Sequence, residues 1–483
     1  MTPTHKFMNR LTTSVLCILL AAFVMSACDF LDPTDVRNPQ TTESSLREGG
    51  TGATVPFLVG VQEAFSSAVE DIAYFTDVVS DNYDNVATFI SPQADLPRSM
   101  VPQDLTLNGG GGPYFEVQEL RALADFTLTG VIPNDAEATP VQLAEVTFFR
   151  GMANLISAEN FGGVPIVEDG PVVPPSQLLQ LAVDDFKSAL STSQHEGFAT
   201  RIHIVLARAY RDMGDVAMAE AEANAALASG PADFLFNAEY DAENNTNTAY
   251  VFAVARNLND VQPLPRLDYL DPKYTVEDAP IPVAKMEEAH LILAEVELSK
   301  GNAAAAAGHL ADAIALAKTR PVVPFLDPDP RPDNTTGSTR PQSGTVQASP
   351  SAPAIAGLIL PRGGNLVQVP SVSGTSLDEA TVRGLTDPVQ LFYDLYLARQ
   401  EIFFFEGRRM NDLGIRLPMM EREIETNDTI NAGDPGTVVI VPDFIPPGDE
   451  LDAFTFDGAN TVIKFDMNQV LTDNRFSPFN MPF

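Results

Sequence analysis

Apolar side chains recur every three to four residues through much of this chain, which is the spacing of amphipathic helices. In the segment 56–80, Phe57, Val61 and Phe65 fall on one face, and Pro56 suits the first turn of a helix. The same pattern predicts further helices over 114–127, 141–160, 176–191, 200–213, 216–229, 284–300, 303–319 and 388–413. We therefore expect a mainly α-helical fold.

Long irregular segments separate these helices. They cover about 81–113, 232–284, 320–385 and 414–483. Such lengths within a compact domain indicate functional loops or short strands laid over the surface. We expect a short hairpin within 359–370, around Gly363 and Gly364, and a strand over 438–441.

Two of the predicted helical hairpins repeat each other with a shift of 87 residues. The matching small residues are Ala207 and Ala294, Gly214 and Gly301, Ala219 and Ala306, and Ala226 and Ala313. Small residues let two antiparallel helices approach closely, and the glycine permits the turn between them, as in tetratricopeptide repeats. The alternative is a generic alanine-rich hairpin. Because the segment 232–284 separates the two hairpins, we expect a helical frame from which loops project.

The N-terminus has the organisation of a secretory signal peptide. Lys6 and Arg10 precede an apolar run over 16–25, which is too short for a transmembrane helix. We expect residues 1–27 to be removed.

Cys28 follows the small residues Ser26 and Ala27, and this arrangement is typical of the bacterial lipobox. We expect Cys28 to be acylated, residues 28–55 to form a tether and entry loop, and residues 56–483 to form a single domain. The alternative is an ordinary signal peptide cleaved near Ala27, with Cys28 left as a thiol.

The charge balance excludes one class of partner. The chain has 65 acidic and 29 basic residues and a net charge of −36. Removal of residues 1–27 takes away Lys6 and Arg10 and no acidic residue, which leaves a net charge of −38. Such a chain repels phosphates, so we expect no nucleic-acid partner. Only seven lysines occur, which favours either adaptation to high salt or a bias of the lineage.

Four segments carry a resemblance to a known family. They are Phe30–Pro33 after Cys28, Ala144–Arg150 with Asn160–Pro165, Glu288–Asn302, and Ala398–Leu413, which contains Phe405-Glu406-Gly407-Arg408-Arg409. In this order they resemble the SusD/RagB family of nutrient-binding outer-membrane lipoproteins. The chain departs from the family pattern at Ala398, where Glu is usual, at Met410 and Asn411, where an aromatic is common, and in having no Trp.

The resemblance implies a SusD-like helical scaffold, lipid-anchored at the outer membrane and facing the exterior. It implies a protein that binds a glycan or peptide and delivers it to a SusC-like TonB-dependent transporter as its lid. The alternative is a tetratricopeptide-repeat scaffold at the surface or in the periplasm, which holds other proteins and binds no small ligand.

Catalytic motifs are missing from the sequence, so we expect no enzyme and no cofactor. The histidines lack metal-type spacing. Acidic runs at 327–329 and 449–452 could hold Ca²⁺, although a solvated surface run is the simpler explanation. We interpret Arg399, Glu406, Arg409 and Asp412 as charges that hold the fold, with Glu406 and Arg409 close enough in sequence to pair on one helix face.

The candidate ligand loops are 77–90 and 109–116. The ligand-binding residues that we predict there are Asp77, Asp81, Asn82, Tyr83, Asp84 and Tyr114. Carboxylates and amides beside an aromatic ring are what recognition of a sugar requires. The alternative is an ordinary polar turn after a helix, and in that case the site falls in 232–284 or 320–385.

Overall fold

The computed structural model describes residues 50–85, 92–193, 195–255, 261–326, 341, 343–362, 364–447 and 451–477. The chain divides into two units, Met1–Gly50 and Thr51–Phe483. Every helix and strand described below belongs to the second unit. The predictions for the signal peptide, Cys28 and most of the tether lie outside the described residues.

Helices dominate this unit, which confirms the predicted fold class. The longer ones are α3 (Thr54–Val79), α4 (Pro113–Phe126), α5 (Pro140–Asn160), α6 (Pro175–Thr192), α7 (Phe198–Met213), α8 (Val216–Ser229), α10 (Met286–Ser299), α11 (Ala303–Thr319) and α13 (Pro388–Ile402). The shorter ones are α9 (Thr248–Tyr250), α12 (Glu379–Arg383), α14 (Arg409–Asp412), α15 (Glu421–Thr426) and α16 (Met467–Asp473). In the described part of the chain, no helix is both long enough and apolar enough to cross a membrane.

Local chemistry sets the helix ends. Thr139 and Gln142 form a reciprocal capping box at the start of α5, with Pro140 in its first turn. Gly214 ends α7 with a φ of 74°, which favours glycine. Asp215 then caps α8 by accepting a hydrogen bond from the Met218 amide. The turn between α7 and α8 is therefore specified within a few residues.

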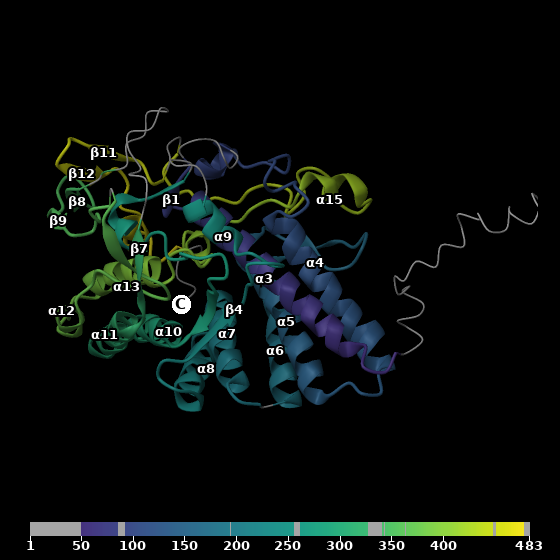
Figure 1. Cartoon of the computed structure of the whole chain (residues 1–483). Coiled ribbons are helices and arrows are strands. Elements are labelled where there is room, and N and C mark those ends of the chain that lie inside the picture. The colour runs from purple at the N-terminus through teal and green to yellow at the C-terminus, as the bar shows by residue number, and fades with distance from the viewer. Residues whose placement is uncertain are drawn as a thin grey trace, which may run out of the picture. The chain divides into compact units, whose positions relative to one another are not determined.

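The helices pack as antiparallel neighbours around one core. The helix α3 packs on α4, α5 on α6, α7 on α8, and α10 on α11, and α8 also contacts α10 (Figure 1). The repeated small residues Ala207, Ala219, Ala226 and Ala294 are all buried, as the tetratricopeptide spacing predicts. Buried apolar residues from all of these helices form one contiguous cluster.

Short strands join segments that are distant in sequence. They are β1 (Tyr83–Asp84), β2 (Val164–Pro165), β3 (Val172–Val173), β4 (Leu235–Ala238), β5 (Gln262–Pro263), β6 (Ile281–Lys285), β7 (Val322–Leu326), β8 (Thr345–Gln347), β9 (Ile355–Ala356), β10 (Leu366–Pro370), β11 (Phe454–Phe456) and β12 (Asn460–Ile463). The pairs β1–β5, β2–β3, β4–β6 and β7–β10 are antiparallel, and β11, β12, β8 and β9 form a four-stranded sheet in that order.

Two predicted strand features are wrong. The hairpin within 359–370 does not form, because β10 pairs with β7, which lies more than 40 residues earlier in the chain. The segment 438–441 makes a single isolated bridge, between Ile440 and Arg416, and forms no strand. Both apolar runs find partners across the fold instead of beside them in sequence.

The predicted helix over 388–413 is broken in the middle. The helix α13 ends at Ile402, and α14 begins at Arg409. Between them Phe405 and Gly407 have positive φ angles of 59° and 69°, which a continuous helix does not permit. The prediction that Glu406 and Arg409 pair with each other is therefore wrong, since they do not share a helix face.

The charges of this segment are nevertheless buried in ion pairs. Arg399 donates two hydrogen bonds of 2.8 Å to Asp412. Glu406 lies 2.5 Å from the Lys273 ammonium and 2.6 Å from that of Lys285. Each of these buried charges has an oppositely charged partner, which is consistent with the structural role that the sequence predicts for them.

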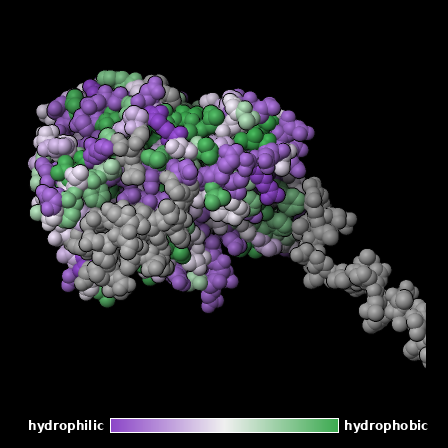
Figure 2. All heavy atoms as spheres, turned by 90° about the horizontal axis from the view of Figure 1, so that it is seen from above, coloured by the Kyte–Doolittle hydropathy of each residue, from purple (hydrophilic) through white to green (hydrophobic). Residues whose placement is uncertain are grey.

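The surface follows from the composition. In the view of Figure 2, hydrophilic and hydrophobic residues are interspersed over the described part of the face. The most exposed large apolar side chains, Leu105 and Phe476, lie far apart in the sequence. Two others, Leu326 and Leu366, face each other across the β7–β10 ladder. Exposed apolar side chains are ordinary on folded proteins.

Candidate ligand-binding pocket

The two aromatic residues predicted to stack on a ligand are core residues. Tyr83 is 0% exposed and Tyr114 is 1% exposed. The Tyr83 hydroxyl donates to Asp271 at 3.0 Å, and the Tyr114 ring packs edge-on against Phe161 with centroids 5.3 Å apart. A side chain with no accessible surface cannot stack on a sugar, so this part of the site prediction is corrected.

The polar residues of the same predicted site are also buried. Asp81 accepts two hydrogen bonds from Arg409, at 2.5 and 2.8 Å. Asp77 accepts from the Phe405 amide at 2.7 Å and from Asn82 at 3.0 Å. Burial raises the pKa of Asp77 to about 7. After α3 the chain turns into the core, where these groups contact the segment around α14.

Asp84 is the one predicted residue that is half-buried. It lies with Asp95 and Asp452, and one carboxylate oxygen from each lies within 4.8 Å of the others. Asp452 belongs to the acidic run over 449–452 that the sequence offered for Ca²⁺. The other sequence candidate, 327–329, lies outside the described residues.

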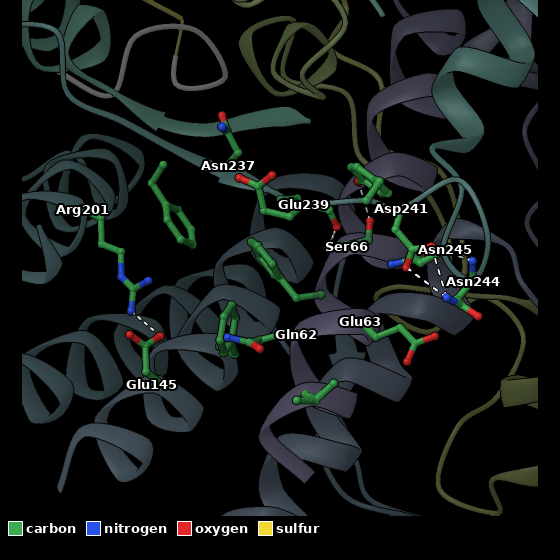
Figure 3. Close-up of a pocket in the computed structure, with 16 residues that line it drawn as sticks. Gln62, Glu63, Ser66, Glu145, Arg201, Asn237, Glu239, Asp241, Asn244 and Asn245 are labelled. Carbon is green, nitrogen blue, oxygen red and sulfur yellow. Dashed lines mark hydrogen bonds and ion pairs between the residues drawn. The ribbon is translucent and has the colours of Figure 1, made fainter. Parts of the chain in front are cut away.

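A pocket with a cavity volume of about 590 Å³ opens elsewhere, between α3, α5, α7, β4 and the loop that follows β4 (Figure 3). Its polar lining residues are Gln62, Glu63, Ser66, Glu145, Arg201, Asn237, Glu239, Asp241, Asn244 and Asn245. A volume in this range suits a small ligand. The pocket is our candidate functional site.

Aromatic side chains form its floor. Phe65 and Phe149 are buried with ring centroids 5.0 Å apart, and Phe236 lies 6.3 Å from Phe65 in a stacked arrangement. The Arg201 guanidinium lies 4.6 Å from the Phe236 ring centroid and forms an ion pair with Glu145. Burial lowers the pKa of Arg201, while Glu145 opposes that shift. Phe65 and Phe149 therefore pack beneath the cavity, and the half-buried Phe236 is the ring that can meet a ligand, beside the fixed cation of Arg201.

The strand β4 is shaped to line the pocket. Its ladder with β6 shifts register between Phe236 and Asn237. The extra residue of this bulge lies on β6, because consecutive residues of β4 oppose Ala284 and Pro282. The residues after it, Glu239 to Asn245, leave the ladder and form the loop at one end of the cavity (Figure 3).

Two sets of hydrogen bonds hold that loop. The Tyr240 hydroxyl donates to the Ser66 carbonyl at 2.8 Å, and the Ser66 hydroxyl donates to the Glu239 carbonyl at 2.8 Å. The Asp241 carboxylate accepts from the amide nitrogens of Glu243 and Asn244, both at 2.8 Å. These amides lower the pKa of Asp241. The loop is thus fixed to α3 while its polar side chains stay exposed.

Further along α3 lie two buried carboxyls. Glu70 accepts from the amide and hydroxyl of Thr248, at 2.6 and 2.9 Å. Burial raises the pKa of Glu70 to about 7 and, with the help of Glu70 itself, that of Asp71 to about 8. Both are nearly inaccessible, so they belong to the packing behind the pocket.

The pocket is equipped for binding. Among the described residues that line it there is no histidine and no cysteine. The Ser66 hydroxyl donates to a backbone carbonyl, so it has no base to activate it. Glu145 is shared between Arg201 and His195, whose Nε2 lies 2.7 Å away. The accessible groups are amides, carboxylates and the half-buried Phe236 ring, which are groups that recognise polar ligands.

The pocket lies partly in the inserted segment 232–284, which the sequence predicts as an alternative location of the site. The loop residues 239–245 fall within the inserted segment 232–284, and the run Asp241 to Asn245 carries several hydrogen-bonding side chains. Three other lining residues, Gln62, Glu145 and Arg201, lie on helices that the sequence predicts to be part of the scaffold. Only the packing of α3, α5 and α7 brings them together.

Solved structures provide the comparison. Three are similar to this chain with a TM-score of 0.50. The first is a SusD superfamily protein from Bacteroides fragilis, which is 11% identical, and the match covers 77% of this chain and 89% of that one. The second is a SusD superfamily protein from Bacteroides vulgatus, which is 13% identical, with 79% of this chain and 98% of that one covered, and the third is a SusD homolog from Bacteroides thetaiotaomicron, which is 12% identical, with 77% and 88% covered.

The chain therefore has the SusD-like fold, as its sequence motifs predict. No family model and no curated protein matches the sequence. The fold by itself does not determine a ligand, because ligand specificity resides in the residues of the site.

Proposed function

We propose that this protein is a SusD-like nutrient-binding lipoprotein and that it binds a carbohydrate in the pocket between α3, α5, α7 and β4. The observation that carries the proposal is the combination of the half-buried Phe236 ring with exposed carboxylates and amides around a cavity of about 590 Å³. Sugar rings present apolar C–H faces and a rim of hydroxyls, so they need both kinds of group. The SusD-like fold supports the same assignment.

The charges of the pocket favour a neutral ligand or a cationic one. Glu63, Glu239 and Asp241 line it without a cationic partner among the contacts that the structure describes, whereas Arg201 is already paired with Glu145. An acidic ligand would meet net negative charge here and across a chain of net charge −36. A neutral glycan fits best, and a basic peptide is the second candidate.

Location and partner belong to the same proposal. We infer that Cys28 is acylated after removal of residues 1–27, that the protein faces the exterior of the outer membrane, and that it delivers its ligand to a SusC-like TonB-dependent transporter. The signal-like N-terminus and the resemblance to the SusD/RagB family support this. Acylation predicts a lipid-modified Cys28 in the mass spectrum of protein from its native membrane. A free Cys28 thiol, or another mature N-terminus, would contradict it.

Binding is tested by isothermal titration calorimetry with a panel of neutral oligosaccharides and basic peptides. Gln62→Ala and Glu239→Gln change exposed side chains at the mouth of the pocket, so folding should be unaffected. A hydrogen bond contributes ~0.5–1.5 kcal/mol, so each change should weaken the ligand about two- to tenfold. Gln177→Ala is the matched control, because Gln177 is an exposed amide on α6 outside the pocket.

The outcomes separate the two functional classes. A ligand whose affinity falls in both pocket variants and not in the control supports the proposal. If a ligand binds and its affinity is unchanged in all three variants, the binding site lies elsewhere. If no member of the panel binds, while the protein co-purifies with other proteins through its helical hairpins, the scaffold function is favoured instead.

A further inference from the structure

The second helical hairpin brings together three metal-binding side chains that the sequence keeps apart. His290 lies on α10, and His309 and Asp312 lie on α11, three residues apart and hence on one face. One ligand-type atom from each lies within 4.8 Å of the others. We propose that His290, His309 and Asp312 form a binding site for a divalent transition-metal ion such as Zn²⁺.

The internal repeat provides the strongest argument. With the repeat shift of 87 residues, His203 corresponds to His290, and Glu222 corresponds to His309. In the first hairpin the Nδ1 atom of His203 lies 2.6 Å from a Glu222 carboxylate oxygen, so the two groups satisfy each other. The second hairpin keeps the histidine but replaces its carboxylate partner with a second imidazole.

In the second hairpin, neither imidazole has the carboxylate partner that His203 has in the first. The ring centroids of His290 and His309 are 5.9 Å apart. The Nδ1 atoms of both are buried and have no hydrogen-bond partner among the described residues. Unpaired nitrogen atoms are costly in a packed interface, and a bound cation would satisfy imidazole nitrogens from both helices.

The third ligand also belongs to the second hairpin alone. Asp312 corresponds to Ala225 in the first hairpin. Its Oδ1 atom lies 2.8 Å from Arg383, and both side chains are 45% exposed. The second carboxylate oxygen therefore remains for a metal, and the site has an open side through which an ion and its water ligands can enter.

The donor set selects the class of metal. Two imidazoles and a carboxylate suit Zn²⁺, Ni²⁺ or Cu²⁺, whereas Ca²⁺ and Mg²⁺ take oxygen ligands. Zn²⁺ binds nitrogen at ~2.0–2.1 Å, so its ligand atoms must lie ~3.3 Å apart in a tetrahedral site. Because the present ligand atoms lie within 4.8 Å of one another, the side chains must close by at most about 1.5 Å, which rotation about their own bonds allows.

The test is titration of purified, untagged full-length protein with ZnCl₂, and separately with CoCl₂, whose absorption spectrum reports tetrahedral coordination. The wild type should bind one equivalent of Zn²⁺ at this site with micromolar or tighter affinity. His290→Gln and Asp312→Asn should each weaken that equivalent at least tenfold.

Two further variants make the result specific. His309→Leu removes the second imidazole and supplies no other ligand, so it should fold and still lose the tetrahedral Co²⁺ spectrum. His203→Gln removes a histidine from the matching position of the first hairpin and should leave metal binding intact. Failure of the wild type to bind Zn²⁺ below ~100 µM, or equal losses in His203→Gln and His290→Gln, would overturn the proposal.

Discussion

The buried contact between Asp81 and Arg409 yields the most demanding stability prediction. Arg409 is 1% exposed, and Asp81 is equally inaccessible. The guanidinium donates two hydrogen bonds to the carboxylate, at 2.5 and 2.8 Å, and a third to Asn468 at 3.0 Å. Asp81→Asn preserves the shape of the side chain and removes its charge, so it leaves a buried cation without its bidentate partner.

The expected magnitude follows from that burial. Removal of one partner of a buried ion pair costs ~3–5 kcal/mol, because the remaining charge cannot recover its hydration. Arg409 keeps the hydrogen bond to Asn468, so we expect a loss near 3 kcal/mol. Lys300→Gln is the control, since Lys300 and Glu220 form a pair in which both side chains are 35% exposed, and such pairs contribute ~0–1 kcal/mol.

Urea denaturation followed by far-UV circular dichroism measures both changes as shifts of the unfolding midpoint. The double variant Asp81→Asn, Arg409→Gln completes a thermodynamic cycle. Removal of both charges should cost less than the sum of the single changes, with a coupling of ~1–3 kcal/mol. If Asp81→Asn shifts the midpoint no more than Lys300→Gln does, or if the two changes are additive, the electrostatic role of this contact is refuted.

Three other predictions follow from the same structure. Asp71 has its folded pKa raised from the ordinary value of 3.8 to about 8, so its protonated form stabilises the fold below pH ~4 and that stability is lost as the pH rises through 8. Thermal melts should show Asp71→Asn equal to the wild type at pH 4 and more stable at pH 8.5; a constant difference between the two would contradict the shift. With a net charge of −36, the melting temperature should rise between low salt and about molar NaCl, where the Debye length falls to ~3 Å, and a flat or falling profile would remove the electrostatic explanation. Tyr83→Ala should destabilise the protein by ~3–5 kcal/mol, as expected for a large buried ring, whereas Tyr83→Phe loses only a hydrogen bond worth ~0.5–1.5 kcal/mol. If Tyr83→Ala is as stable as the wild type, the ring is not part of the core.

Most of the helical frame could be predicted because its signals are local. The apolar period of 56–80, Pro113 after its glycine run, and the Gly214-Asp215 turn each act within one or two helical turns. The spacing of alanines identified the two hairpins for the same reason, since small residues let two neighbouring helices approach closely. These features require no knowledge of distant parts of the chain.

The ligand loop was mistaken because its partners lie far away in sequence. Asp81 and Tyr83 look like a polar turn with an aromatic ring when they are considered alone. In the folded chain Arg409 lies 328 residues from Asp81, and Asp271 lies 188 residues from Tyr83. Polarity in a short segment cannot distinguish a group that meets solvent from one that meets a buried charge.

The sequence by itself determined the helices, their turns and the repeat, because hydrophobic period, capping and small-residue contacts act between neighbours in the chain. Only the tertiary structure decided which polar residues stay accessible. It buried Asp77, Asp81 and Asn82, opened a pocket between α3, α5 and β4, and placed His290 beside His309. The physical reason is that a binding site needs groups from several elements to converge, and their convergence depends on how the helices pack against one another.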